Sequence, residues 1–221
     1  LLNEVMKGHP MIRRSDRCPI QGETPIAFLN RIQKVGYRLN PFTVGVAEEL
    51  LRLERQVGKF LPIVNYTFPN KPHDIDTNDV ARKSYRREMA EVHNKQAQEF
   101  RRSCRTRMTM DAVKRFKGRD RFYLPWSLDY RGRAYPIPSF LTPQDTDFGK
   151  SLLMFADEAF MTPDAEDWLG FQVATTYGLD KSTITDRLKW VEENFTLISA
   201  VATDPVRNLP LWEVAEEPWQ F

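Results

Sequence analysis

The stretch from Thr77 to Lys117 constrains the fold most, because about forty residues pass there without a proline or a glycine. Good helix formers dominate it. A narrow apolar stripe runs along it at helical spacing, formed by Tyr85, Met89, Val92, Phe100, Cys104 and Met108. A stripe this thin is typical of a helix that packs against one neighbour and is otherwise in water. The sequence therefore predicts one long helix, which forms a protruding antiparallel hairpin with a shorter helix expected over residues 41–58.

The long predicted helix is strongly basic. Thirteen Lys or Arg and four Asp or Glu lie between Arg82 and Arg119, which gives this segment a charge of +9 in a chain of net charge +2. Four acids are too few for ion pairs one helical turn apart to neutralise thirteen bases. A solvated helix face is the simpler interpretation, but uncompensated cations repel each other unless a phosphate backbone is nearby. We therefore expect this helix to contact nucleic acid.

The rest of the chain is expected to form shorter helices joined by turns. Asn40-Pro41 and Thr162-Pro163 are helix start signals, since an N-cap residue precedes a proline at the first helical position. Prolines predict an extended connection over residues 60–76, and Thr183 to Asp186 is typical of a capping box. Residues 1–23 show little periodicity and are expected to be irregular.

Composition narrows the classes of function. No run approaches eighteen consecutive apolar residues, so neither a membrane span nor a membrane partner is expected. Cys18 and Cys104 lie far apart and the histidines are scattered, so the sequence predicts neither a disulfide nor a metal site. The first residues lack the pattern of a signal peptide, and we expect the chain to be a piece of a longer polypeptide.

The most unusual stretch is Phe122 to Leu141, where aromatic residues surround the charged run Asp129-Tyr130-Arg131-Gly132-Arg133. On a strand, residues i and i+2 project to one face, so Arg131 and Arg133 would grip successive phosphates of one backbone. Gly132 allows a close backbone approach. Asp129 would orient Arg131 through an ion pair or receive a ribose 2′-hydroxyl.

The aromatic residues of this stretch fit either of two interpretations. Tyr130 and Tyr135 would stack on a base or a sugar if the stretch binds nucleic acid. A buried salt bridge among core aromatic residues, with Gly132 at a bulge, accounts for the same sequence. The residues alone leave both interpretations open.

The run Asp129 to Pro136 resembles the D-x-x-G-R motif of the single-subunit, phage- and mitochondrial-type DNA-directed RNA polymerases. The resemblance extends over about residues 24–221 and is densest over residues 122–155. It includes residues at the family's spacing, namely Phe122 to Pro125, Pro143, Gln144, Asp147, Lys150, Leu152, Leu153, Trp190 to Asn194, Asp204 and Pro205. Tyr37 to Asn40 and the basic helix are similar to the region that enters the thumb.

This resemblance implies a mainly α fold with a small antiparallel β element, as part of a right-hand polymerase with thumb and palm. It divides the chain into the end of an N-terminal region (1–35), a thumb-like basic helical hairpin (36–120) and the N-terminal part of the palm (121–221). It also implies a set of nucleic-acid contacts, namely Asp129, Arg131, Gly132, Arg133, Tyr135, Gln144, Lys150 and Arg102. Among them, Arg131 and Arg133 would hold the template strand and the RNA–DNA hybrid, and Tyr135 would lie near the hybrid or the incoming nucleotide.

The function implied by the resemblance is that of a monomeric DNA-dependent RNA polymerase. Its partners would be a DNA template, the RNA product and nucleoside triphosphates, in the cytoplasm of a bacterial host or, alternatively, in a mitochondrion or plastid. The family's two Mg²⁺ ions are held by aspartates in motifs that this chain lacks, so no catalytic residue is expected here.

Two positions depart from the family, since Asp145 and Glu158 stand where it often has glycine. If the backbone there requires a positive φ, a non-glycine residue costs about 1 kcal/mol at each position. Two functions of other classes compete with the polymerase. One is a stand-alone helical nucleic-acid-binding module without catalysis, and the other is a scaffold whose basic helix pairs with an acidic protein.

Overall fold

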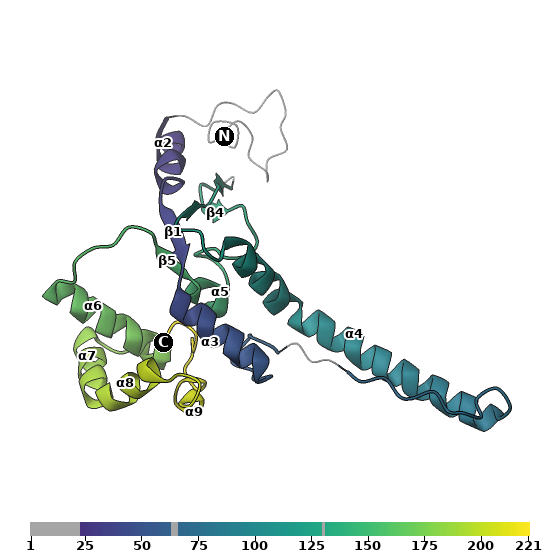
Figure 1. Cartoon of the computed structure of the whole chain (residues 1–221). Helices are drawn as coiled ribbons and strands as arrows, with labels where there is room; N and C mark the ends of the chain where they lie inside the picture. The colour runs from purple at the N-terminus through teal and green to yellow at the C-terminus, as the bar shows by residue number, and fades with distance from the viewer. Residues whose placement is uncertain (1–22, 63–65, 130) are drawn as a thin grey trace.

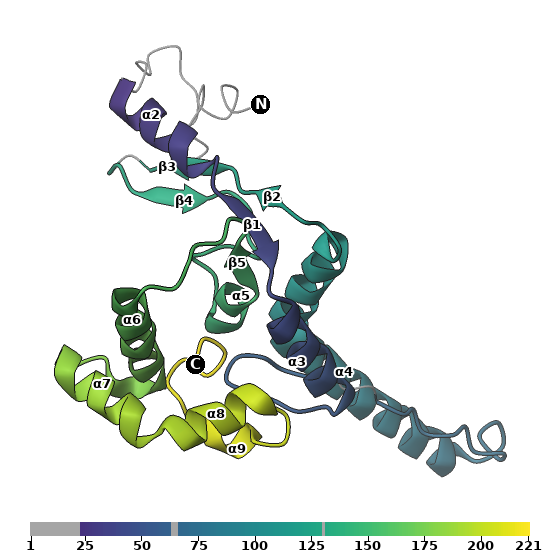
Figure 2. The same cartoon turned by 60° about the vertical axis from the view of Figure 1, so that its left-hand side comes forward.

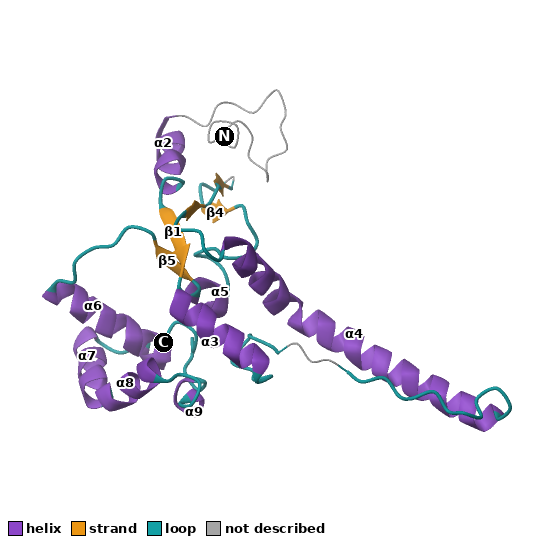
Figure 3. Cartoon of the chain, in the orientation of Figure 1, coloured by secondary structure: helices purple, strands orange, loops and turns teal. Residues whose placement is uncertain are grey.

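The computed structural model describes residues 23–62, 66–129 and 131–221. Figures 1 and 3 show a mainly helical chain with small antiparallel sheets, which confirms the predicted fold class in outline. The helices are α2 (Glu23–Ile32), α3 (Pro41–Arg52), α4 (Asp79–Phe116), α5 (Asp147–Ser151), α6 (Pro163–Ala174), α7 (Ile184–Glu193), α8 (Phe195–Thr203) and α9 (Leu209–Trp212), with a π-helical turn, η1 (Thr175–Leu179), after α6. The strands are β1 (Gly36–Leu39), β2 (Phe122–Tyr123), β3 (Trp126–Leu128), β4 (Ala134–Pro136) and β5 (Leu153–Phe155). The predictions for residues 1–22 and for Tyr130 lie outside the described residues.

Helix α4 confirms the long helix predicted from the proline- and glycine-free stretch. The Asn78 side chain caps its first turn by accepting the backbone N–H groups of Val80 and Ala81. Figures 1 and 2 show α4 projecting away from the rest of the chain, with the extended segment 66–78 beside its far half. In that contact the ring centres of Phe68 and His93 lie 5.0 Å apart.

The helical partner predicted for α4 is wrong in its extent and its place. Helix α3 ends at Arg52 instead of residue 58, and the chain then turns through left-handed φ angles of +53° at Glu54 and +54° at Gly58. Buried residues of α3 share a core with Met110 and Val113 at the near end of α4. The far half of α4 is accompanied by the extended segment, because the prolines there exclude a helix.

The main core joins α3, the near end of α4, α5 and the C-terminal segment. The rings of Phe60, Phe148 and Trp219 pack against one another, with centroids 4.6 to 4.8 Å apart. Trp219 also donates its indole N–H to the carbonyl of Val57 at 3.3 Å. The last residues of the chain are therefore part of the core that supports α5.

The strands form two separate sheets. The first has the order β2-β1-β5, with Tyr37 opposite Phe122 on one side and opposite Phe155 on the other. The second is the hairpin β3–β4, with Trp126 opposite Pro136. Because β1 precedes α4 while β2 and β5 follow it, the first sheet takes strands from both sides of residue 120. The division into domains at that residue stays a prediction.

The C-terminal helices α6 and α7 pack against each other (Figure 2). Thr183 caps α7 by accepting the N–H of Asp186 at 3.2 Å, as the capping-box pattern predicts. Arg187 is 6% exposed, its guanidinium lies 4.2 Å from the centre of the Phe171 ring, and it donates to the Thr175 hydroxyl at 2.8 Å. This arginine thereby holds the turn that joins the two helices.

Candidate nucleic-acid interface

The tip of the hairpin between β3 and β4 contains the charged run that the sequence singles out. The N–H of Asp129 donates to the Arg133 carbonyl at 2.9 Å, and the N–H of Gly132 donates to the Asp129 carbonyl at 3.0 Å. Gly132 has a φ of +79°, a left-handed conformation that favours glycine. Arg131 and Gly132 therefore lie in a turn. The prediction that Arg131 and Arg133 project from one face of a strand is wrong.

A buried carboxylate organises this turn. Asp129 is 5% exposed, and its Oδ1 accepts the backbone N–H groups of Arg131 and Arg133, each at 2.9 Å. Its Oδ2 accepts Nε of Arg133 at 2.7 Å and lies 2.6 Å from Nη2 of the same side chain. Burial opposes the ionisation of Asp129, but the hydrogen bonds from Arg133 and Arg131 outweigh it and hold the pKa below its ordinary value. Asp129 thus forms an ion pair with Arg133.

Arg133 remains accessible in spite of this pair. Its side chain is 57% exposed, and the hydrogen bonds to Asp129 raise its pKa. The centre of the guanidinium lies 5.5 Å from the centre of the Tyr135 ring, which is itself exposed. Arg131 and Gly132 are exposed at the tip. The hairpin therefore presents to solvent a fixed guanidinium beside an aromatic ring.

The loop over residues 140–146 contacts both the hairpin and α4. Gln144 donates its side-chain N–H to the carbonyl of Ala134 in β4 at 2.9 Å. The side chain of Asp145 is fully buried and pairs with Arg105 of α4. Sequence reasoning missed this pair, because its members lie forty positions apart and no local pattern links them.

The two positions where the family often has glycine are not strained. Neither Asp145 nor Glu158 has a positive φ, so the predicted cost of a side chain at these positions does not arise. Glu158 instead pairs with Arg38 at 2.6 Å. The left-handed residue of the loop is Leu141, with a φ of +54°. Its N–H donates to Oδ2 of Asp145 at 3.0 Å, so the buried carboxylate stabilises this strained residue.

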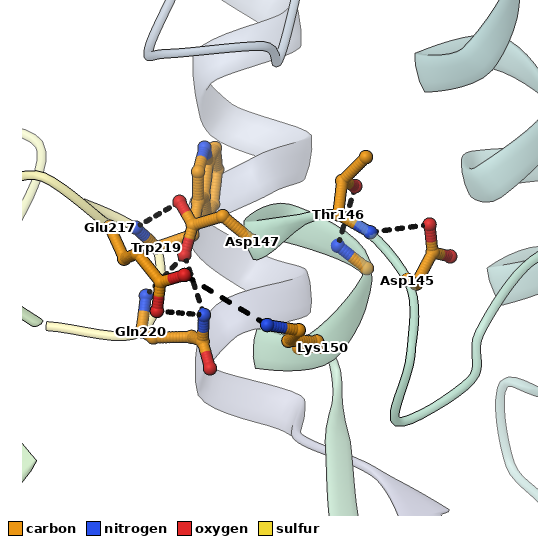
Figure 4. A network of polar contacts seen from close by, with 8 residues as sticks. Asp145, Thr146, Asp147, Lys150, Glu217, Trp219 and Gln220 are labelled. Carbon is orange, nitrogen blue, oxygen red and sulfur yellow. Dashed lines mark hydrogen bonds and ion pairs between the residues drawn. The ribbon is translucent and has the colours of Figure 1, made fainter. Parts of the chain in front are cut away.

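Helix α5 binds the C-terminal segment (Figure 4). Oδ2 of Asp147 accepts the N–H of Trp219 at 2.9 Å, and its Oδ1 accepts the N–H of Gln220 at 3.2 Å. Burial raises the pKa of Asp147, although these hydrogen bonds act against the shift. Lys150 lies 3.9 Å from Glu217 across the same contact. The structure thus places Lys150 beside an acid of the C-terminal segment, and its contact with nucleic acid stays a prediction.

The basic surface of α4 is only partly neutralised by acids. Arg102 is exposed and pairs with Glu99 at 2.9 Å, one of several ion pairs within the helix. Other cations of α4 form no salt bridge to any residue that the structure describes, namely Lys83, Arg86, Lys95, Arg101, Arg107 and Arg115. The charge excess predicted from the sequence is therefore present on the folded helix.

The predicted contact residues fall on three parts of the fold. The hairpin brings together Asp129, Arg131, Gly132, Arg133 and Tyr135, and Gln144 is hydrogen-bonded to it. Arg102 lies on α4, and Lys150 lies on α5. Their joint role in binding stays a prediction.

A family model described as DNA-dependent RNA polymerase matches residues 161–221. The DNA-directed RNA polymerase of Enterobacteria phage K11 is 32% identical over 194 residues, which is 87% of this chain and 21% of that protein. The mitochondrial DNA-directed RNA polymerase of Neurospora crassa is 26% identical over 87% of the chain and 13% of its own length. Over most of its length the chain is therefore similar to phage- and mitochondrial-type DNA-directed RNA polymerases.

The match confirms the resemblance inferred from the hairpin motif and the residues that follow it. T7 RNA polymerase of Escherichia phage T7 is 27% identical over 87% of this chain, and the matched part is 22% of that protein. The chain therefore spans about a fifth of the length of these phage relatives.

The described part of the chain does not contain a group of side chains suited to bind a metal ion. Over residues 23–62, 66–129 and 131–221, no group of three His, Cys, Asp or Glu side chains is placed to hold an ion. These side chains do not fit a two-Mg²⁺ site, so no chemical step is assigned to them. Among the same residues, no helix is both long enough and apolar enough to cross a membrane.

Proposed function

We propose that the chain is part of a DNA-dependent RNA polymerase that copies a DNA template into RNA from nucleoside triphosphates. Within that enzyme, this piece binds the template strand and the RNA–DNA hybrid. The names of its relatives support this function over a stand-alone binding module or an acidic-protein scaffold. A monomeric enzyme, in the cytoplasm of a bacterial host or in a mitochondrion or plastid, is part of the same proposal.

The observation that carries the proposal is the Arg133 guanidinium, which Asp129 fixes while more than half of the side chain stays exposed. Guanidinium groups bind phosphate through directed, charge-assisted hydrogen bonds. A guanidinium that is already oriented loses less rotamer freedom when it binds. Tyr135 beside it offers an aromatic face on which a base or sugar stacks.

Helix α4 supplies the second part of the proposed surface. At 1.5 Å per residue its 38 residues span about 57 Å, which exceeds one turn of a duplex, about 34 Å. The α4 cations that form no salt bridge to a described residue extend from Lys83 to Arg115, so they follow most of that length. Each phosphate that they neutralise releases condensed counter-ions, which favours binding at low salt.

In this proposal α4 and its neighbours between residues 36 and 120 form the thumb. Residues 121–221 begin the palm, and residues 1–35 end an N-terminal region. Arg102 and Lys150 extend the contact beyond the hairpin, on α4 and on α5. The complete enzyme would use Mg²⁺, whose ligands we place outside this chain.

A salt titration of hybrid binding tests the proposal. The anisotropy of a labelled RNA–DNA hybrid gives its affinity for the chain between about 50 and 200 mM salt, where about six phosphate contacts cost about a thousandfold in affinity. A peptide of Asp and Glu with matched charge is the comparison. Tighter binding of the peptide would support the scaffold instead, and a hybrid affinity that hardly changes with salt would contradict phosphate contact.

A further inference from the structure

One buried carboxylate connects the basic helix to the loop beneath the hairpin. The side chain of Asp145 is 0% exposed, and its Oδ1 accepts the N–H of Thr146 at 2.7 Å while its Oδ2 accepts the N–H of Leu141 at 3.0 Å. A Cβ atom at Gly149 would overlap the carboxyl group, so α5 packs directly against it. Asp145 is therefore held in place from the loop and from α5 before Arg105 is considered.

Arg105 joins α4 to this carboxylate. Its guanidinium pairs with Oδ1 of Asp145 and lies 5.5 Å from the centre of the Phe140 ring, so two residues of the loop hold it. Among the described residues, the other four salt bridges of α4 join positions three or four apart within the helix. Among the described residues, the Arg105 pair is therefore the salt bridge that joins α4 to another element, in addition to the apolar core at the near end of the helix.

The loop continues this connection to the hairpin. Gln144, the residue before Asp145, donates to the Ala134 carbonyl at 2.9 Å. Ala134 follows Arg133, whose guanidinium is fixed by Asp129. Polar contacts and the peptide bonds between them thus link α4 through the loop to the exposed guanidinium.

We propose that the Arg105–Asp145 pair is the joint that sets the position of α4 relative to the hairpin, with Arg105 a positioning residue and not a phosphate contact. This inference rests on the proposed function, since it says how the two basic surfaces are aligned on one nucleic acid. Arg105 is 52% exposed, so a direct phosphate contact is the natural competing role. The two roles predict opposite changes in the affinity for the hybrid when the charge of Asp145 is removed.

Asp145→Asn distinguishes the two roles by the sign of its effect. If Arg105 positions α4, the variant loosens the joint, and the affinity for a hybrid that spans both surfaces falls by about tenfold. If Arg105 binds phosphate in competition with Asp145, the variant frees a cation and removes an anion, and the affinity rises. Arg105→Gln separates them again, because loss of a phosphate contact lowers the salt slope by about 0.9, whereas loss of positioning leaves it unchanged.

The experiment compares wild type, Asp145→Asn, Arg105→Gln and the double variant in hybrid-binding anisotropy at several salt concentrations. Asp111→Asn is the matched control, because Asp111 forms an exposed pair with Lys114 within the same helix. We expect the double variant to bind no more weakly than the weaker single variant, and Asp111→Asn to bind at least as tightly as wild type. Tighter hybrid binding by Asp145→Asn, or additive losses of affinity in the double variant, would contradict the proposed positioning role of the Arg105–Asp145 pair.

Hydrogen exchange gives a readout that does not depend on hybrid binding. In Arg105→Gln, which replaces a half-exposed side chain, we expect faster amide exchange over residues 126–146 and unchanged exchange in α6 and α7. Unchanged exchange over residues 126–146 would overturn the joint even if hybrid binding fell. If the wild-type chain does not bind the hybrid, the proposed function fails, and the exchange result still decides whether the joint exists.

Discussion

Arg133 donates its Nε to the buried Asp129 carboxylate at 2.7 Å while more than half of the Arg133 side chain stays in solvent. The same carboxylate accepts the backbone N–H groups of Arg131 and Arg133, so it shapes the turn and aims the guanidinium together. The sequence suggested either a phosphate clamp or a buried ion pair. In the fold, one ion pair joins the buried carboxylate of Asp129 to the exposed guanidinium of Arg133.

The first prediction concerns the coupling of these two residues. Arg133→Ala leaves the Asp129 carboxylate buried without its ionic partner, so we expect a lower midpoint of thermal unfolding. Asp129→Asn should also lower it, but the double variant should lose less than the two single variants combined. Circular dichroism of the four proteins measures these midpoints. Additive losses would show that the pair does not stabilise the turn directly.

The second prediction is a pH dependence with a defined sign. The folded-state pKa of Asp129 lies below the unfolded value, so its contribution to stability is present above about pH 4 and is lost as the pH falls through the folded pKa. The difference in unfolding midpoint between wild type and Asp129→Asn should therefore shrink below about pH 4. A difference that stays constant down to pH 2 or so would mean that Asp129 keeps an ordinary pKa.

Asp147 provides a comparison of opposite sign. Burial raises its folded-state pKa, so its contribution is present below the unfolded pKa, about 4, and is lost as the pH rises through the folded pKa. The stability of wild type relative to Asp147→Asn should therefore increase as the pH falls. Thermal unfolding over the same pH series measures both aspartates, and parallel trends for the two variants would contradict the assignment.

The third prediction compares two helical glycines. A Cβ at Gly149 would overlap the Asp145 carboxyl, which is fixed from several sides, so Gly149→Ala should lower the free energy of unfolding by about 2 kcal/mol. A Cβ added at Gly45 in α3 would meet no atom within 4 Å. Gly45→Ala should therefore raise the free energy of unfolding by up to about 1 kcal/mol. Urea denaturation measures both. A neutral Gly149→Ala would mean that Asp145 can move aside.

The fourth prediction concerns the buried cation between α6 and α7. Arg187→Ala removes the hydrogen bonds to the Thr175 hydroxyl and the Asp180 carbonyl and leaves a cavity, so we expect a loss of about 3 kcal/mol in the free energy of unfolding. Lys189→Ala in the same helix removes an exposed ion pair and should cost less than about 0.5 kcal/mol. Equal costs for the two variants would rule out a specific role for Arg187.

Much of the helical framework follows from local signals in the sequence. The absence of proline and glycine from Thr77 to Lys117 predicts α4, and the caps at Thr162 and Thr183 predict the starts of α6 and α7. These predictions succeed because helix ends depend on a few adjacent residues and their backbone N–H groups. The predicted end of α3, at residue 58, is wrong because the chain leaves the helix after Arg52 and adopts left-handed φ angles at Glu54 and Gly58.

The candidate site was predicted less completely, for two physical reasons. The i, i+2 argument assumes a strand, whereas the left-handed Gly132 and the side-chain hydrogen bonds of Asp129 close the chain into a turn. The Arg105–Asp145 pair joins residues forty positions apart, so it depends on tertiary packing. The sequence did mark Asp145 as unusual, but it suggested a strained turn and not a buried partner for α4.

The central claim is that the exposed guanidinium of Arg133 neutralises a phosphate of the RNA–DNA hybrid. The most direct measurement is the slope of log affinity against log salt for Arg133→Ala, at a temperature where each protein is folded. Arg52→Ala on α3 is the control, because Arg52 is also exposed and paired with a carboxylate, that of Glu49. We predict that Arg133→Ala reduces the magnitude of the slope by about 0.9 and weakens binding, while Arg52→Ala leaves both unchanged. Wild-type slope and affinity in Arg133→Ala would contradict the account.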